Sequence, residues 1–228
     1  MSHDNFATQV LQFFTSLKLT ASLPRGVQVL NPYQDKLVFE LCHQFYTQYY
    51  SDTNPRTMII GINPGRFGGG LTGIPFTDPI KLEMICGIKN NLTRKQELSS
   101  DYIYKMIDAF GGTNLFYQNF YFTSVSPLGF TREGKNLNYY DDAKLTERIK
   151  PFMLECMRSQ LDFGINTKMA YCLGEGDNYK FLSQFNEQHQ FFEKIIPLAH
   201  PRFIMQYKRK SLNQYLDRYL KALSLSVN

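Results

Sequence analysis

The chain has 228 residues, a mass of 26.6 kDa, 43% hydrophobic residues and a net charge of +5, which suits one α/β domain with a sizeable core. The N-terminus lacks the features of a signal peptide, and no apolar run approaches the roughly 18 residues of a membrane helix, so we expect a soluble, cytoplasmic protein. The positive charge is compatible with a nucleic-acid partner without requiring one.

Hydrophobic periodicity and turn residues predict the elements in chain order. They are a helix over 1–18, a connection over 22–32, a helix over 36–50, a strand over 57–62, a glycine-rich loop over 63–79, helices over 80–86 and 101–110, a strand over 119–125, a loop over 126–140, a helix over 141–162, a strand over 168–173, a helix over 178–187, a strand over 194–198 and a helix over 209–223. Pro151 must kink or restart its helix. We treat residues 1–228 as one domain, with 1–28 as an N-terminal helix and connection.

Strands that alternate with helices predict a mainly parallel sheet of four strands, with helices on both faces. Ligands of such sheets bind beyond the carboxyl ends of the strands. The most unusual segments follow three predicted strands: Gly61–Gly65 after the first, Ser124–Pro127 at the second and His200–Phe203 after the fourth. We therefore expect these three segments to meet in one site.

The segment after the first strand is rich in Asn, Pro and Gly. Glycine lets the backbone pass close to a ligand, and Pro64 biases Asn63 toward an extended conformation. An Asn held rigidly at a strand end can orient a water molecule or a base carbonyl. The alternative is a glycine-rich surface loop that binds no ligand.

Other ligand motifs have less support. Gly68, Gly70 and Gly73 spell the dinucleotide-binding pattern G-x-G-x-x-G, but Pro75 and Pro79 interrupt the helix that this pattern should open. The absence of Gly-Lys-Ser/Thr excludes a P-loop. The four cysteines form no C-x-x-C pair, which disfavours a zinc or iron–sulfur site and indicates reduced, mostly buried thiols.

Two segments together resemble a known family. Gly61-Ile-Asn-Pro-Gly-Arg-Phe-Gly, followed by Thr72-Gly-Ile-Pro-Phe, is similar to motif 1 of the single-strand-selective monofunctional uracil-DNA glycosylases, a branch of the uracil-DNA glycosylase superfamily. His200-Pro-Arg-Phe resembles motif 2 of the superfamily. Weaker similarities at 29–33, 43–46, 122–128 and 134–137 spread the match over most of residues 29–211. The resemblance implies the superfamily's α/β fold and a DNA glycosylase without metal or cofactor.

The resemblance also implies a role for each matching residue. Asn63 corresponds to the catalytic Asn that positions the hydrolytic water, and His200 to the histidine that stabilises charge on the leaving base. Phe76 corresponds to the aromatic residue that stacks on the extruded base. Ile62 and Gly65 stand where backbone groups line the base pocket.

Elementary energetics is consistent with these roles. Extruding a base from a duplex costs roughly a few kcal/mol, and stacking on an aromatic ring recovers ~1–3 kcal/mol. Negative charge grows on the departing base, and a hydrogen-bond donor such as His200 lowers the barrier by stabilising it. Neither motif contains a Lys, so we expect hydrolysis by water without lyase chemistry.

Ser124 departs from the family, which usually has an Asn there to bind the edge of uracil. An Asn amide donates and accepts at once, whereas a serine hydroxyl is shorter and rotates freely. We therefore expect relaxed base selection, extending to 5-substituted uracils or to other deaminated bases such as xanthine. The alternative is that Ser124 only ends its strand.

DNA contacts are expected beside both motifs. Pro201, Arg202 and Phe203 begin the segment that corresponds to the family's wedge, which fills the gap left in a duplex. Phosphate contacts, which weaken with salt, are expected from four further basic residues: Arg66, Lys208, Arg209 and Lys210. A solvated helix face is the alternative for the last three.

The predicted function is a monomeric, monofunctional glycosylase that removes uracil or a related damaged base from single- or double-stranded DNA. One alternative is the same chemistry on xanthine, hypoxanthine or mismatched bases. Another is a catalytically silent DNA-binding module, against which the presence of both Asn63 and His200 argues.

Overall fold

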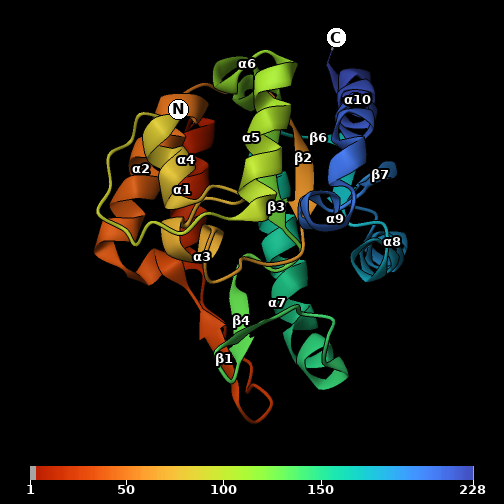
Figure 1. Ribbon diagram of the computed structural model, residues 1–228. Helices are drawn as coiled ribbons and strands as arrows, with labels where there is room; N and C mark the ends of the chain where they lie inside the picture. The colour runs from red at the N-terminus through yellow and green to blue at the C-terminus, as the bar shows by residue number, and fades with distance from the viewer. Residues whose placement is uncertain (1–3, 228) are drawn as a thin grey trace.

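The computed structural model describes residues 4–227 and contains two β-sheets (Figure 1). The larger sheet has four parallel strands in the order β3-β2-β6-β7, namely β2 (Arg56–Gly61), β3 (Phe120–Ser124), β6 (Ile165–Leu173) and β7 (Lys194–Leu198). The smaller sheet is antiparallel in the order β1-β4-β5, namely β1 (Val27–Leu30), β4 (Gly129–Arg132) and β5 (Lys135–Leu137). The predicted α/β domain with a central four-stranded parallel sheet is confirmed.

The α-helices of the described residues are α1 (Phe6–Ser16), α2 (Lys36–Tyr50), α3 (Gly69–Thr72), α4 (Pro79–Met84), α5 (Leu98–Phe110), α6 (Thr113–Asn119), α7 (Ala143–Leu161), α8 (Asp177–His189), α9 (Pro201–Tyr207) and α10 (Leu212–Leu223). Short 3-10 turns are η1 (Pro32–Gln34), η2 (Arg209–Ser211) and η3 (Ser224–Ser226). Residues 1–3 of the predicted first helix lie outside the described residues.

Helices cover both faces of the larger sheet, as predicted. Successive side chains of a strand point to opposite faces, so neighbours in β3 identify the two layers. The Thr123 hydroxyl donates to Gln160 Oε1 of α7 at 2.6 Å on one face. On the other face, Phe122 stacks on Phe116 of α6 with ring centroids 5.4 Å apart. Figure 1 shows α5 on the viewer's side of the sheet, with β2 beside it.

Strand β2 brings the site segments together. Met58, Ile59 and Ile60 are buried, a continuous apolar run typical of a parallel strand covered on both faces. The strand ends at Gly61, which is paired in register with Ser124 of β3. The chain therefore leaves the sheet at neighbouring points after both strands, and the segments that follow them share one edge.

The expectation of a plain connection over 22–32 and a loop over 126–140 is wrong. These residues contain β1, β4 and β5, which have four, four and three residues. Strands this short carry too few positions for an alternating pattern to indicate them. The pairing of β1 with β4 also joins segments distant in the chain, which local patterns do not report.

The last helix begins later than expected. Residues 209–211 form the turn η2, and α10 begins at Leu212, so Lys208–Lys210 follow α9 instead of opening the last helix. Helices α6 and α9 escape the sequence patterns because each has only seven residues. Helix α7 runs through Pro151 without a restart.

The four cysteines are buried and free of disulfides, as expected from their spacing. They are Cys42, Cys86, Cys156 and Cys172. No helix within residues 4–227 is long and apolar enough to cross a bilayer.

Candidate active site

A cleft of about 620 Å³ opens at the carboxyl ends of the parallel strands. Its walls include Ile62 after β2, Ser124 at the end of β3 and His200 after β7. The three segments expected to meet are thus brought together, and the loop Gly174–Gly176 after β6, with Asp177 at the start of α8, adds a fourth wall. The volume lies within the roughly 300–1,000 Å³ of small-molecule sites.

The Asn63 side chain is held by the residues around the end of β5. Its Oδ1 accepts a hydrogen bond from the Tyr139 N–H at 3.0 Å, and its Nδ2 donates to the Leu137 carbonyl at 3.2 Å. These two hydrogen bonds fix the orientation of the amide, because one needs the oxygen and the other needs the N–H group. The second lone pair of Oδ1 remains available to a further donor, such as a water molecule.

Strand β5 also holds the backbone beyond Asn63. The Asn136 Oδ1 accepts a hydrogen bond from the Arg66 N–H at 3.1 Å. A Cβ added at Gly65 would lie 3.0 Å from Asn136 Nδ2, so the close approach of β5 favours glycine there. Gly65 therefore presents bare backbone to the cleft that it lines.

Phe76 occupies a strained turn. Its φ of +56° lies in the left-handed region, which bulky residues rarely adopt. The buried Thr72 organises this turn, because its hydroxyl donates to the Thr77 carbonyl at 2.7 Å and accepts from the Ile74 N–H at 3.1 Å. The Phe76 ring lies over Gly61, where an added Cβ would come within 2.8 Å of it. Such strain is typical of functional sites.

His200 lies across the cleft from Phe76, with ring centroids 6.4 Å apart. The residue caps α9, and its Nδ1 accepts a hydrogen bond from the Arg202 N–H at 3.1 Å. An accepting Nδ1 carries no proton, so the neutral ring has its proton on Nε2. Burial and, less strongly, the Arg202 charge lower the pKa of His200 to about 4. The ring is therefore neutral at physiological pH and keeps one N–H to donate.

Ser124 forms a second polar point in the cleft. The residue is buried, at 6% exposed, beside Gly61 and the ring of Phe76. No hydrogen bond among the described residues involves its hydroxyl. The hydroxyl can therefore donate to a ligand or accept from it.

The wedge segment forms helix α9 at the mouth of the cleft. Pro201 is buried at its first position, where its missing N–H costs nothing. Arg202 and Phe203 line the cleft, and Arg202 is the only Lys or Arg among the described residues that do so. Phe203 and Tyr207 expose 40% and 66% of their surface, with ring centroids 5.7 Å apart.

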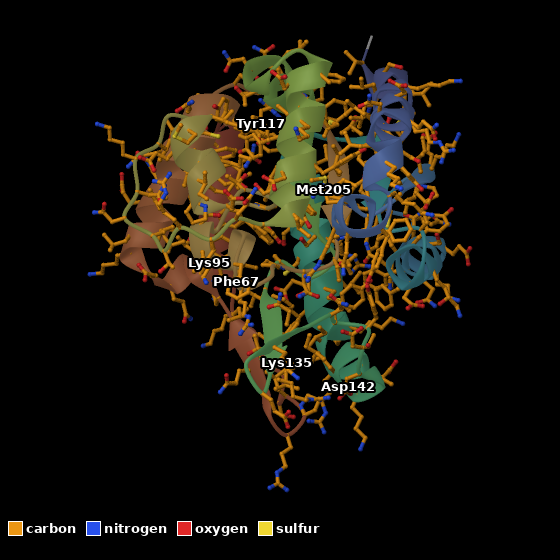
Figure 2. All side chains as sticks on the ribbon, in the orientation of Figure 1. Phe67, Lys95, Tyr117, Lys135, Asp142 and Met205 are labelled. Atoms are coloured by element: carbon orange, nitrogen blue, oxygen red, sulfur yellow. The ribbon has the colours of Figure 1, made fainter. Side chains whose placement is uncertain are left out.

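The remaining predicted basic residues lie outside the cleft wall. The Arg66 guanidinium stacks on Phe67 at 4.5 Å and donates to the Gly134 carbonyl. Figure 2 shows Lys95 beside Phe67 at this edge of the molecule. Lys208–Lys210 are exposed beyond α9.

Several cleft residues escape the sequence patterns, among them two groups that contain acidic residues. Glu97 and Ser99 line the cleft from the start of α5, and Glu175 and Asp177 line it from the segment that joins β6 to α8. The second group follows a predicted strand, so the strand-end rule could have found it. The first group meets the cleft only through tertiary packing, which no local pattern indicates.

The cleft thus combines an oriented amide, a neutral N–H donor, an aromatic ring and a free hydroxyl. Such a set can hold a planar heterocycle and stabilise negative charge that grows on it. No group of three or more His, Cys, Asp or Glu within residues 4–227 is arranged to hold a metal ion.

The comparisons with known proteins point in one direction. A family model described as the Uracil DNA glycosylase superfamily matches residues 47–224, which include both motifs. Among solved structures, the chain is similar to the crystal structure of wild-type SMUG2 from Pedobacter heparinus, with 45% identity, a TM-score of 0.95 and 98% of each chain covered. No curated protein matches the chain.

Proposed function

Because the chain belongs to the uracil DNA glycosylase superfamily, the family that its two motifs predicted, we propose that it hydrolyses the N-glycosidic bond of uracil or a related damaged base in DNA by water attack. The reaction would begin base excision repair. The observation that carries this proposal is the single tautomer of His200, which keeps an Nε2–H on a residue that lines the same cleft as Asn63 and Phe76.

His200 is the proposed electrophilic catalyst. As the bond between the sugar C1′ and the base nitrogen breaks, the electron pair moves onto the base and leaves negative charge there. A donor that binds that charge stabilises the transition state more than the ground state. The low pKa of His200 supports a role as hydrogen-bond donor, because a neutral imidazole keeps its proton.

Asn63 is the proposed residue that positions the hydrolytic water. The fixed direction of its amide supports this role, because the free lone pair of Oδ1 has one preferred direction. Water oxygen would attack C1′, and its proton would pass to solvent after the bond to the base has broken. An amide cannot take up that proton, so activation of the water is weak.

Phe76, Ile62, Gly65 and Ser124 form the proposed base pocket. The Phe76 ring stacks on the extruded base, and the backbone of Ile62 and Gly65 lines its edge. The free hydroxyl of Ser124 supports relaxed base selection, because one rotating O–H can match a carbonyl or an N–H. Uracil, 5-substituted uracil and xanthine are therefore the proposed substrates.

The proposed partner is single- or double-stranded DNA, and the protein acts as a cytoplasmic monomer without metal or cofactor. Pro201 sets the start of α9, and Arg202 and Phe203 project from it as the wedge. Arg66 and Lys208–Lys210 lie farther out and would contact phosphates along the strand.

A panel of oligonucleotides tests this function. Each carries one uracil, 5-hydroxymethyluracil, xanthine or hypoxanthine, and alkali cleaves the abasic sites that base release creates. We expect strand scission for several of these bases, and Ser124→Asn should narrow the range toward uracil because an amide binds its edge at two points. If no oligonucleotide in the panel is cut, the proposed glycosylase activity is wrong. If Ser124→Asn releases the same set of bases as the wild type, Ser124 is not the cause of relaxed base selection.

A further inference from the structure

Glu97 brings a carboxyl group into the cleft where three elements meet. The residue precedes α5, whose first turn lies between α3 and α9 in Figure 1. Its carboxylate packs against Gly68, where an added Cβ would overlap Oε2. The side chain lines the same cleft as Asn63 and His200, but the mechanism proposed above gives it no part.

The Glu97 carboxylate has no partner within residues 4–227, because no hydrogen bond or ion pair there involves either of its oxygens. Its surroundings are also unfavourable to charge. The Glu97 N–H donates to Asp78 Oδ2 at 3.1 Å, which places a second, fully buried carboxylate beside it. Arg202 of α9 is the cation that acts on it. Asp101, one turn along α5, is paired with Lys81 at 2.7 Å.

These neighbours determine where Glu97 exchanges its proton. Burial and the Asp78 carboxylate raise the pKa of Glu97 to about 7, and the Arg202 charge opposes this rise. The group is therefore a mixture of acid and carboxylate at neutral pH. His200 does not titrate in the same range, because its pKa is about 4.

Entry of DNA into the cleft favours the protonated form of Glu97 over the carboxylate. A phosphate near the cleft disfavours a second negative charge, which raises the pKa of a nearby carboxyl group. A phosphate that binds Arg202 also weakens the cation that opposes the rise. The neutral acid gains an O–H that can donate to a phosphate oxygen.

We propose that Glu97 is a DNA-contacting residue that acts in its protonated form, so that binding of DNA takes up a proton at this side chain. The inference rests on the proposed function, since it needs DNA in this cleft. If Glu97 takes up a proton when DNA binds, DNA must bind more tightly at low pH. Between pH 6 and pH 8 the Kd should rise about tenfold, because at pH 8 most of the free protein must first gain the proton.

Calorimetric titration tests the proposal. The ligand is a duplex with one tetrahydrofuran abasic analogue, which the protein can bind but not process. Titrations at pH 7 in two buffers of different ionisation enthalpy give the number of protons taken up, and titrations from pH 6 to pH 8 at constant salt give the slope of affinity. We expect proton uptake and a tenfold loss of affinity for the wild type.

Two variants test whether the proton that is taken up binds to Glu97. Glu97→Gln keeps the shape but cannot titrate, so we expect no uptake at this site, a flat pH profile and tighter binding than wild type at pH 8. Glu155→Gln changes an exposed glutamate on α7, outside the cleft, and should behave as wild type. A purely structural role for Glu97 would shift the affinity equally at every pH and leave the proton uptake unchanged.

The possible results distinguish an error in the role of Glu97 from an error in the proposed glycosylase function. Equal proton uptake in wild type and Glu97→Gln overturns the role of Glu97, even if both release bases normally. The role of Glu97 is also overturned if the affinity of the wild type for DNA does not change between pH 6 and pH 8. Failure of the wild type to release any base overturns the proposed function, and with it the reason to expect DNA in the cleft.

Discussion

His200 is neutral because of its contacts rather than because of its residue type. A free histidine titrates near pH 6.5, but here burial disfavours the charged ring and the Arg202 N–H occupies Nδ1. The same contact that starts α9 therefore selects the tautomer of a histidine that lines the cleft. Structure and proposed chemistry depend on one hydrogen bond.

This arrangement predicts a pH effect on stability. The unfolded chain binds a proton at His200 near pH 6.5 and the folded chain only near pH 4, so between these values the unfolded state holds more protons. Protonation of His200 should therefore lower the free energy of unfolding as pH falls from 6.5 to 4. Glu97, whose pKa is raised to about 7, adds stability over part of the same range in both proteins, so the loss at His200 is measured as a difference. In urea denaturation, stability should change less favourably with falling pH in the wild type than in His200→Gln. His43→Gln, at an exposed histidine on α2, is the control. Identical pH profiles for wild type and His200→Gln would contradict the account.

At the scale of elements, the turn that carries Phe76 depends on Thr72. We expect Thr72→Val to destabilise the fold by about 1–3 kcal/mol, because the Thr77 carbonyl and the Ile74 N–H lose a buried partner. Phe76 should then leave its strained φ, and base release should slow by roughly tenfold or more because the stacked base is misplaced. Single-turnover kinetics and denaturation measure both effects. Thr15→Val, an exposed threonine on α1, is the control. An unchanged rate would show that the turn does not need Thr72.

Helix α9 presents Phe203 at the mouth of the cleft, and its role as wedge predicts a difference between substrates. A duplex needs a side chain to fill the gap left by an extruded base, whereas single-stranded DNA has no gap. Phe203→Ala should therefore slow base release from duplex DNA more than from single-stranded DNA. Leu115→Ala removes an exposed apolar residue far from the cleft, on α6, as the control. Equal slowing on both substrates would argue against a wedge.

The longer strands and helices could be predicted from the sequence better than the short ones. The four strands of the larger sheet carry apolar runs such as Met58–Ile60, and the strand-end rule then located Asn63, Ser124 and His200 correctly at one cleft. The small sheet has strands of three or four residues, and its β5 holds Asn63 through contacts that no local pattern reports. The position of Glu97 depends on how α5 packs, which is likewise a property of the tertiary structure.

At the scale of the whole molecule, the charge distribution differs between the cleft and its surroundings. Glu97, Glu175 and Asp177 line the cleft, and Arg202 is the only Lys or Arg within residues 4–227 that does so, which leaves room for a phosphate only beside Arg202. The exposed run Lys208–Lys210 lies outside it. We infer that most phosphates follow this outer run, while one phosphate lies beside Arg202 and a single base enters the cleft.

Salt dependence tests this division. Each phosphate contact changes the slope of log affinity against log salt by about 0.9. Lys210→Ala should therefore reduce the slope for duplex binding by about that amount. Lys194→Ala, an exposed lysine at the opposite end of β7, should leave it unchanged. Equal slopes in wild type and Lys210→Ala would remove this side chain from the DNA interface.

The central claim is that Asn63 in this cleft drives hydrolysis of a damaged base, and one comparison tests it most directly. Single-turnover release of uracil is measured for wild type and Asn63→Ala, with DNA binding followed by fluorescence anisotropy. We predict that Asn63→Ala slows release by about 10²-fold or more, because the water loses the group that positions it, while the Kd changes little. Release by Asn63→Ala at the wild-type rate would contradict the account.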